Sequence, residues 1–189
     1  MENHKSDREL VTKYLNNDEE AISVLVNRHI KAIYNFAYRL SRNKLDAEDI
    51  AQETFLKAWR NLRKFNPDQN FKSWLMVIAR NTAIDFLRKK KNIPFSNFEN
   101  DESDNALVEN LSDPLPLPDE LASKAEDASQ LNETINKLPV QMRETLLLRL
   151  NENFTFEEIS DILKRPMNTV KSDYRRALIR LKEMLDIGR

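Results

Sequence analysis

Hydrophobic residues recur every three or four positions along most of the chain, and this spacing predicts helices that each bury one face. In the first half we expect four such helices: residues 7–16, residues 18–41, a segment starting at Asp46, and residues 71–90. The chain has a single glycine, Gly188, whereas the hairpin turns of sheet proteins usually need glycine. The pattern therefore predicts an all-α fold.

The third and fourth helices have well-defined faces. On the outer face of the third helix, Asp49, Gln52 and Glu53 fall within little more than one turn. The fourth helix begins with two aromatic residues and ends in a basic run. The residues expected to face inward are Ile50, Ala51, Phe55, Ala58 and Leu62 of the third helix, and Leu75, Ile78, Ala79, Ala83 and Phe86 of the fourth.

The C-terminal part of the chain has a helix-turn-helix pattern. Thr155 and Glu158 can form a capping box at the start of a short helix, Pro166 ends that helix, and Asn168 or Thr169 can cap the next one. The second helix has an apolar stripe opposite a face whose residue types bind phosphates and base edges. The stripe is Val170, Tyr174, Ala177, Leu178, Leu181 and Leu185, and the opposite face is Lys171, Ser172, Arg175 and Arg176. An ordinary helical hairpin with a solvated basic face is the alternative.

Charge divides the chain into three parts. Residues 1–91 carry 18 Lys and Arg against 12 Asp and Glu, residues 92–130 carry 1 against 10, and residues 131–189 carry 11 against 9. The middle part also holds four of the seven prolines. We therefore expect two small helical domains, 1–91 and 128–189, joined by a flexible acidic linker at 92–127, with helix resuming near 121–127. The run Pro114–Pro118 suits a stiff spacer, and a partner-binding motif is the alternative.

Composition argues against several classes of protein. The chain has no cysteine, so we expect no disulfide and no thiolate metal site, and its two histidines, His4 and His29, are far apart in sequence. No apolar run approaches the roughly 20 residues that cross a membrane, and the N-terminus lacks the apolar core of a signal peptide. There is no glycine-rich phosphate loop and no histidine–carboxylate cluster. We expect a cytoplasmic protein that is not an enzyme, with no metal, no cofactor, no membrane insertion and no small-molecule substrate.

Aromatic and basic side chains on the fourth helix favour a nucleic-acid surface. Spacings of four, three and one place on one face Asn81, Asp85, Arg88 and Lys89. An ion pair between Asp85 and Lys89 and a simple cationic helix end are the structural alternatives. Against them stand Phe71 and Trp74, because aromatic side chains beside cationic groups are what single-stranded bases require.

The motifs of both halves together resemble sigma factors of the sigma-70 family, in the compact group called extracytoplasmic-function (ECF) sigma factors. The resemblance rests on Asp46 to Trp59 (DAEDIAQETFLKAW), Phe71 to Arg88 (FKSWLMVIARNTAIDFLR), Leu138-Pro139 followed by Arg143, and the terminal helix-turn-helix. It covers about residues 8–91 and 128–186. The absence of the additional domains that larger members carry fits the ECF group.

The resemblance implies a factor that binds core RNA polymerase and directs promoter-specific transcription initiation. Residues 1–91 would bind core polymerase and open the minus-ten element, residues 128–189 would bind the minus-35 element, and an anti-sigma factor would be a further partner. The implied core-polymerase residues are Asp49, Gln52 and Glu53. The implied DNA-binding residues are Asn66, Asn70, Phe71, Trp74, Asn81, Asp85, Arg88, Lys89 and Lys90 for the minus-ten element, and Thr169, Lys171, Ser172, Arg175 and Arg176 for the minus-35 element.

Several positions depart from the family's pattern. The family often has Ala at Ser160 and Gly at Lys164 and Asn168. Many relatives have a basic residue at Asp173, next to DNA. Because an acid near phosphates repels them, Asp173 either points away from DNA or accepts a hydrogen bond from a cytosine amino group.

Two other classes of protein stay open on the residues alone. A stand-alone helix-turn-helix regulator with an N-terminal sensing or dimerisation domain would bind promoter duplex without polymerase, usually at a symmetric site. A helical adaptor would bind neither. The acidic face at Asp49–Glu53 and the aromatic and basic helix at 71–91 favour the sigma factor, because neither rival needs both.

Overall fold

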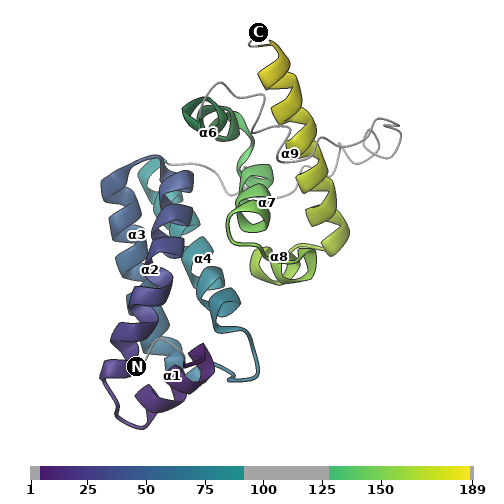
Figure 1. Ribbon diagram of the computed structural model, residues 1–189. Helices are drawn as coiled ribbons and strands as arrows, with labels where there is room; N and C mark the ends of the chain where they lie inside the picture. Colours follow the sequence, from purple (N-terminus) through teal and green to yellow (C-terminus); the bar gives the residue numbers. More distant parts are fainter. Residues whose placement is uncertain (1–4, 92–127, 188–189) are drawn as a thin grey trace. The chain divides into compact units, whose positions relative to one another are not determined.

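The computed structural model describes residues 5–91 and 128–187, and the regular elements in these two ranges are all helices (Figure 1). The chain divides into two compact units, Met1–Ile93 and Pro94–Arg189. The all-α prediction is confirmed for these parts of the chain. The linker expected at 92–127, its proline run and the helix expected near 121–127 lie outside the described residues.

In the N-terminal unit, the described helices follow the predicted order. α1 spans Asp7–Leu15, α2 spans Glu20–Ser41, α3 spans Lys44–Asn61 and α4 spans Phe71–Lys91, with a short 3-10 helix, η2, at Leu62–Lys64. The predicted bounds agree with these to within two residues. α2 packs against α1, α3 and α4, and α3 also packs against α4.

The core of this unit lies where α2, α3 and α4 meet. Leu25 and Ile33 of α2, Ile50 of α3 and Leu75 of α4 are each at most 1 % exposed. Such large aliphatic side chains contribute about 1.5–3 kcal/mol each when fully buried. The packing of these three helices therefore fixes the direction of the polar faces that they turn outward.

The buried face of α4 differs in part from the prediction. Leu75, Ala79 and Ala83 are buried as expected, but Ile78 and Phe86 are only half-buried. The remaining buried positions of the helix are Phe71, Met76, Thr82, Ile84 and Leu87. α4 contacts both α2 and α3, so its buried stripe is wider than a single neighbour requires. Residue spacing gives the direction of a side chain, but not how far the neighbouring helices cover it.

The C-terminal unit contains the predicted helix-turn-helix. Its described helices are α6 at Ala128–Lys137, α7 at Val140–Leu150, α8 at Phe156–Leu163 and α9 at Met167–Ile187. The capping box is confirmed: the backbone N–H of Thr155 donates to Glu158 Oε2 at 2.8 Å, and that of Glu158 donates to Thr155 Oγ1 at 3.2 Å. The stripe of α9 is buried at Val170, Ala177, Leu178, Leu181 and Leu185, whereas Tyr174 is half-buried.

The start of α9 corrects one prediction. Neither Asn168 nor Thr169 caps this helix, because the helix already begins at Met167 and both residues lie in its first turn. The N–H of Val170 donates to the carbonyl of Pro166 at 3.0 Å, so the helical bonding starts at the proline. Proline suits the start of a helix, because its fixed φ is already helical.

Within residues 5–91 and 128–187, four residues other than glycine adopt a left-handed backbone. They are Asn17, Arg42, Asn153 and Lys164, with φ between 54° and 69°. Arg42 and Lys164 are the C-caps of α2 and α8, positions where helices commonly use glycine because a Cβ atom is unfavourable there. The left-handed conformation costs a residue with a Cβ atom about 1–2 kcal/mol.

We predict that Lys164→Gly raises the free energy of unfolding by about 0.5–1 kcal/mol, because glycine removes the left-handed penalty but gains freedom in the unfolded chain. Urea unfolding followed by circular dichroism measures this change. The control is Glu183→Gly at an exposed position inside α9, which should instead lower stability by about 0.5–1 kcal/mol. A loss of stability in Lys164→Gly would contradict the strain that we assign to this turn.

Candidate protein and nucleic-acid interfaces

An open apolar groove lies beside the three residues predicted to bind core polymerase. Asp49 and Gln52 are exposed on α3, and Glu53 is half-exposed with its carboxylate 3.7 Å from Lys57 Nζ. The groove has a volume of about 640 Å³ and runs between α2 and α3. Its lining is Val26, Ile30, Lys31 and Tyr34 of α2 and Glu48, Ala51, Gln52, Phe55, Leu56 and Trp59 of α3.

This groove was not among the predicted features, although two residues carried a signal for it. Ile30 and Leu56 are 43 % and 42 % exposed, so each is a large apolar side chain outside the buried stripe of its helix. Gln52 belongs both to the predicted polar face and to the groove lining. The polar face is therefore one rim of an apolar surface, a combination that suits an amphipathic partner helix.

The aromatic residues at the start of α4 form a cluster with Phe65. The ring centroids of Phe65 and Phe71 are 5.4 Å apart, those of Phe65 and Trp74 are 5.1 Å apart, and those of Phe71 and Trp74 are 5.6 Å apart. Phe65 and Phe71 are buried, whereas Trp74 is half-exposed. Of the two aromatics predicted to stack on bases, Trp74 is partly exposed, and Phe71 is buried and packs against it.

The loop before α4 holds the two predicted asparagines, and both use their side-chain oxygens locally. Asn66 Oδ1 accepts a hydrogen bond from the N–H of Asp68 at 3.0 Å. Asn70 Oδ1 accepts one from the N–H of Ser73 at 3.1 Å, which satisfies a free donor at the start of α4. Both asparagines are exposed. The loop conformation is thus fixed by its own side chains beside the aromatic cluster.

A partly buried charged cluster anchors α1 beside this group of rings. Asp7 Oδ2 lies 2.8 Å from His29 Nε2, and Asp7 Oδ1 accepts from Arg28 at 2.6 Å. The His29 ring contacts Phe71, with centroids 5.5 Å apart. Burial raises the pKa of the Asp7 carboxyl, but the hydrogen bonds and charges of His29 and Arg28 outweigh it, so the pKa is lowered from the ordinary 3.8.

The predicted DNA-binding residues of α4 form a track along one side of the helix. At about 100° per residue, Trp74, Asn81, Asp85, Arg88 and Lys89 fall within roughly 100° of one another. From Phe71 to Lys89 the track is about 27 Å long at about 1.5 Å per residue. Asp85 pairs with Arg88 at 3.9 Å, not with Lys89 as the structural alternative supposed. Lys89 is exposed.

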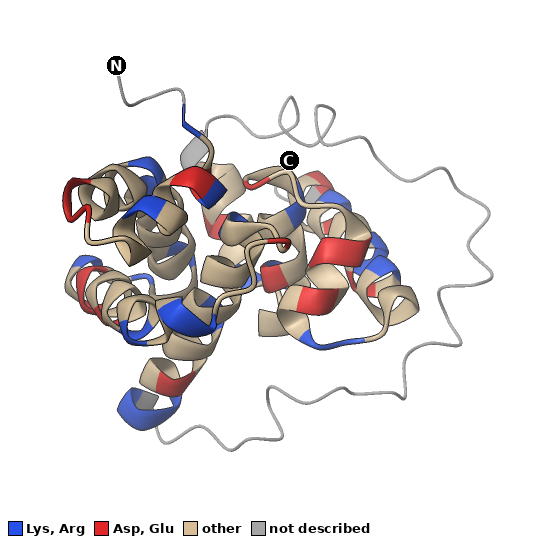
Figure 2. Ribbon diagram, turned by 90° about the horizontal axis from the view of Figure 1, so that it is seen from below, with Lys and Arg blue, Asp and Glu red and all other residues tan. Residues whose placement is uncertain are grey.

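Lys90 lies away from this track. Nine residues separate it from Asn81, which places it about half a turn away, on the opposite side of α4. Its ammonium donates to both carboxylate oxygens of Asp46, at 2.6 and 2.7 Å. Only 10 % of the Asp46 side chain is exposed, so the pair fastens the end of α4 to the start of α3. Figure 2 shows this basic end of α4 where the described chain meets the grey trace.

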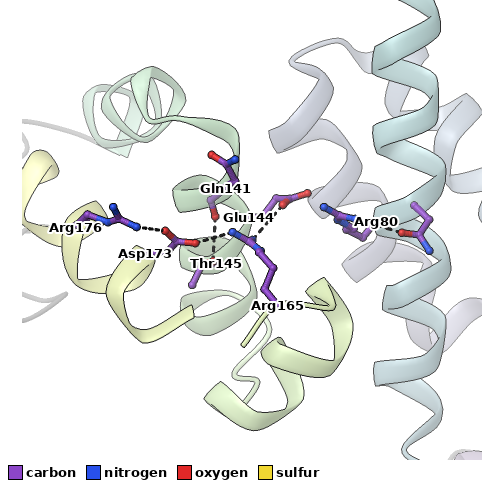
Figure 3. Close-up of polar contacts among 8 residues, drawn as sticks. Arg80, Gln141, Glu144, Thr145, Arg165, Asp173 and Arg176 are labelled. Atoms are coloured by element: carbon purple, nitrogen blue, oxygen red, sulfur yellow. Dashed lines mark hydrogen bonds and ion pairs between the residues drawn. The ribbon is translucent and has the colours of Figure 1, made fainter. Parts of the chain in front are cut away.

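On α9, the predicted minus-35 residues differ in exposure. Lys171 is exposed, and Thr169, Ser172 and Arg175 are half-exposed. Arg176 is largely covered, with 12 % of its side chain exposed. Asp173, for which the sequence left two orientations, points inward: it is 4 % exposed and its carboxylate binds Arg165 at 2.6 Å and Arg176 at 2.8 Å (Figure 3).

Comparison with known proteins identifies both units. Residues 25–93 match the family described as Sigma-70 region 2, and residues 128–181 match Sigma-70, region 4. The ECF RNA polymerase sigma factor SigW of Bacillus subtilis is 32 % identical over 170 residues, which are 89 % of this chain and 90 % of that protein. The chain belongs to the ECF sigma factors of RNA polymerase.

Other relatives and solved structures agree with this assignment. The ECF RNA polymerase sigma-E factor of Salmonella typhimurium is 31 % identical over 192 residues, covering 98 % of this sigma factor and 95 % of that protein. The structure of the sigma factor RpoE with the anti-sigma factor NepR from Bartonella quintana matches with a TM-score of 0.63 and 27 % sequence identity. The match covers 87 % of this chain and 96 % of the RpoE chain. The structure of CnrH with the cytosolic domain of CnrY matches with a TM-score of 0.71 and 24 % sequence identity. This match covers 98 % of this chain and 100 % of the CnrH chain, and it supports the fold.

Membership of the family decides between the classes left open by the sequence. The protein directs transcription initiation as an ECF sigma factor and is not itself an enzyme, so the stand-alone regulator and the adaptor are set aside. Within residues 5–91 and 128–187, no helix is long and apolar enough to cross a membrane. Over the same ranges, no group of three or more acidic, histidine or cysteine side chains could hold a metal ion.

The Asp7 pair predicts a specific acid sensitivity. Because the folded-state pKa of Asp7 is lowered, its contribution to stability is present above pH 3.8 and is lost as pH falls through the folded pKa. Asp7→Asn lacks this contribution. The stability difference between the wild type and Asp7→Asn should therefore be fully present well above pH 3.8 and shrink as the pH falls below that value.

Urea unfolding at several pH values measures that difference. The matched control is Asp68→Asn, since Asp68 forms a surface pair with Arg8 at 3.3 Å and its side chain is 77 % exposed. Surface pairs contribute about 0–1 kcal/mol, so this control should change little. A pH-independent difference for Asp7→Asn would show that the carboxylate charge does not stabilise the fold.

Proposed function

We propose that the two units divide the work of promoter recognition. Residues 1–91 bind core polymerase and open the minus-ten element, residues 128–189 bind the minus-35 element, and residues 92–127 tether them. The observation that carries the role of residues 1–91 is the geometry of their unit: the apolar groove uses α2 and α3, while the aromatic and basic track uses α4. The two surfaces use different helices, so one unit can hold polymerase and DNA together. The protein then acts in the cytoplasm, where polymerase and promoter are.

Run-off transcription tests the proposal as a whole. Core polymerase should initiate at a subset of genomic promoters only when this protein is added. The same promoters with a scrambled minus-ten or minus-35 element should lose the transcript. Duplex binding without any polymerase-dependent transcript would overturn the proposal.

Core polymerase would dock on the groove and on its acidic rim at Asp49, Gln52 and Glu53. The apolar lining suits the apolar face of a partner helix, and the two carboxylates suit basic residues at the edge of that face. An anti-sigma factor is the second proposed partner, since RpoE, a structural neighbour, was solved with one. The complex with core polymerase and the complex with an anti-sigma factor would be two different bound states of the protein.

The minus-ten element would lie along the track on α4. The half-exposed Trp74 offers a stacking surface for an unpaired base, supported by Phe71, and the loop asparagines Asn66 and Asn70 lie beside it. Asn81 and Asp85 offer hydrogen bonds, while Arg88 and Lys89 attract phosphates. Flipping a base costs a few kcal/mol, which stacking on Trp74 at about 1–3 kcal/mol per base offsets in part. On α9 the proposed minus-35 set is Thr169, Lys171, Ser172 and Arg175, because the fifth predicted residue, Arg176, has only 12 % of its side chain exposed.

Substitutions in the groove and on its rim should weaken core binding. We predict that Leu56→Asp lowers affinity for core polymerase about 10- to 30-fold, because an apolar contact is lost and a charge would be buried. Asp49→Lys with Glu53→Lys should lower it by about 10-fold or more. The matched control is Leu45→Asp, at a leucine of α3 that is 71 % exposed and outside the groove lining. Fluorescence anisotropy with labelled protein measures the affinities, and equal effects of Leu45→Asp and Leu56→Asp would refute the docking site.

Neighbouring lysines at the end of α4 should behave differently. Lys89→Ala should weaken binding to single-stranded minus-ten DNA and flatten the plot of log affinity against log salt by about 0.7. Lys90→Ala should leave that slope unchanged and lower stability by about 1 kcal/mol, because it leaves the Asp46 carboxylate without its lysine. Asn81→Ala should slow promoter opening with duplex binding intact. A flatter slope for Lys90→Ala would place that lysine on DNA.

A further inference from the structure

A charged network lies between α7, the helix-turn-helix turn and α9. It joins two carboxylates, Glu144 and Asp173, with two guanidiniums, Arg165 and Arg176 (Figure 3). Arg165 donates to Asp173 Oδ2 at 2.6 Å, Arg176 donates to Asp173 Oδ1 at 2.8 Å, and Arg165 lies 3.5 Å from Glu144. The four side chains are between 1 % and 12 % exposed. Buried charges of this kind persist only when they are paired.

Asp173 occupies the inner side of α9. Three residues from Val170 and four from Ala177, it shares their side of the helix, and both of those residues are fully buried. Arg165 holds the carboxylate there from the turn before α9. That turn is itself fixed by Ser160, whose hydroxyl donates to the carbonyl of Arg165 at 2.6 Å. Ser160 and Asp173 thus support one network, both through Arg165.

Arg176 starts between the inner side of the helix and the side that carries Ser172. At about 100° per residue, its Cα lies about 60° from that of Asp173 and about 40° from that of Ser172. Its guanidinium binds Asp173, which leaves the side chain 12 % exposed. An extended Arg176 would project beside Ser172. The bond to Asp173 holds it against the inner side instead.

We propose that Asp173 is a specificity-determining residue that withholds Arg176 from the minus-35 element. This inference rests on the proposed role of α9 in minus-35 binding. Base recognition then falls to Lys171, Ser172 and Arg175, and Arg176 serves as an internal counter-charge. A polar interaction beneath the helix, and not a contact with DNA, sets which arginine reads the promoter.

The test compares variants in reconstituted holoenzyme, with two measurements for each. The first is selection from a promoter library with a random minus-35 element, and the second is the salt dependence of affinity for promoter duplex. Arg176→Gln should return the parental minus-35 sequence and the parental salt slope. Asp173→Asn releases Arg176, so it should steepen the slope by about 1 and shift the selected base at one position. The double variant should return the parental sequence.

A charge-matched control separates release of Arg176 from a simple gain of positive charge. Asp161→Asn removes an exposed carboxylate from α8 and should not change the selected sequence. A changed sequence or a flatter slope in Arg176→Gln would overturn the proposal, because Arg176 would already touch DNA. Parental behaviour of Asp173→Asn in both measurements would overturn it too. Thermal unfolding of each variant verifies folding, and the Arg176→Gln result is decisive if Asp173→Asn proves unstable.

Failure of the proposed role of α9 is distinguishable from failure of this inference. If Lys171→Ala and Arg175→Ala both return the parental sequence with parental affinity, α9 does not bind the minus-35 element, whatever Asp173 does. If Lys171→Ala or Arg175→Ala changes the selected sequence, α9 binds the minus-35 element. If in addition Asp173→Asn or Arg176→Gln does not give the result expected above, Asp173 does not determine which arginine contacts that element.

Discussion

The helices α2, α3 and α4 each have an apolar stripe, and packing the three helices against one another buries all three stripes. Ile33, Ile50 and Leu75 are at most 1 % exposed at this junction. Because helix packing leaves little freedom in crossing geometry, burying these side chains also fixes what the helices turn outward. The groove on α2 and α3 and the track on α4 are therefore consequences of one packing solution, and a change in the core would move both.

Much of the fold followed from the sequence because the signals were local. The capping box of Thr155 and Glu158 spans three residues, and the helix bounds follow from apolar spacing within each segment. What the sequence did not predict depends on contacts between segments. Lys90 binds Asp46, which lies 44 residues earlier in the sequence. The partial exposure of Ile78 depends on how much of α4 is covered by α2 and α3. Spacing along one helix contains no information about either.

In the candidate site, the polar residues could be picked out from the sequence, but the apolar groove could not. Polar residues such as Asp49 and Lys171 stood out because charge at regular spacing is visible in a sequence. The groove beside Asp49 did not, because an apolar side chain such as Leu56 is read as core until the packing shows it uncovered. Its discovery changes the proposed core-polymerase surface from an acidic patch to an apolar groove with an acidic rim. Such a surface gains affinity from burial and selectivity from charge.

Lys90 and Arg176 show why a count of basic residues overstates the surface offered to DNA. Both belong to basic clusters in the sequence, yet each is bound to a carboxylate that is at most 10 % exposed. To bind a phosphate, Lys90 would have to leave Asp46, and Arg176 would have to leave Asp173, which would then keep only Arg165. The lost contact with a buried acid offsets the new one. The basic residues of these clusters that are not bound to a buried acid are thus fewer than the composition implies. In this protein the internal acids Asp46 and Asp173 shape the basic surface, because each binds a positive charge that its sequence position would otherwise leave extended.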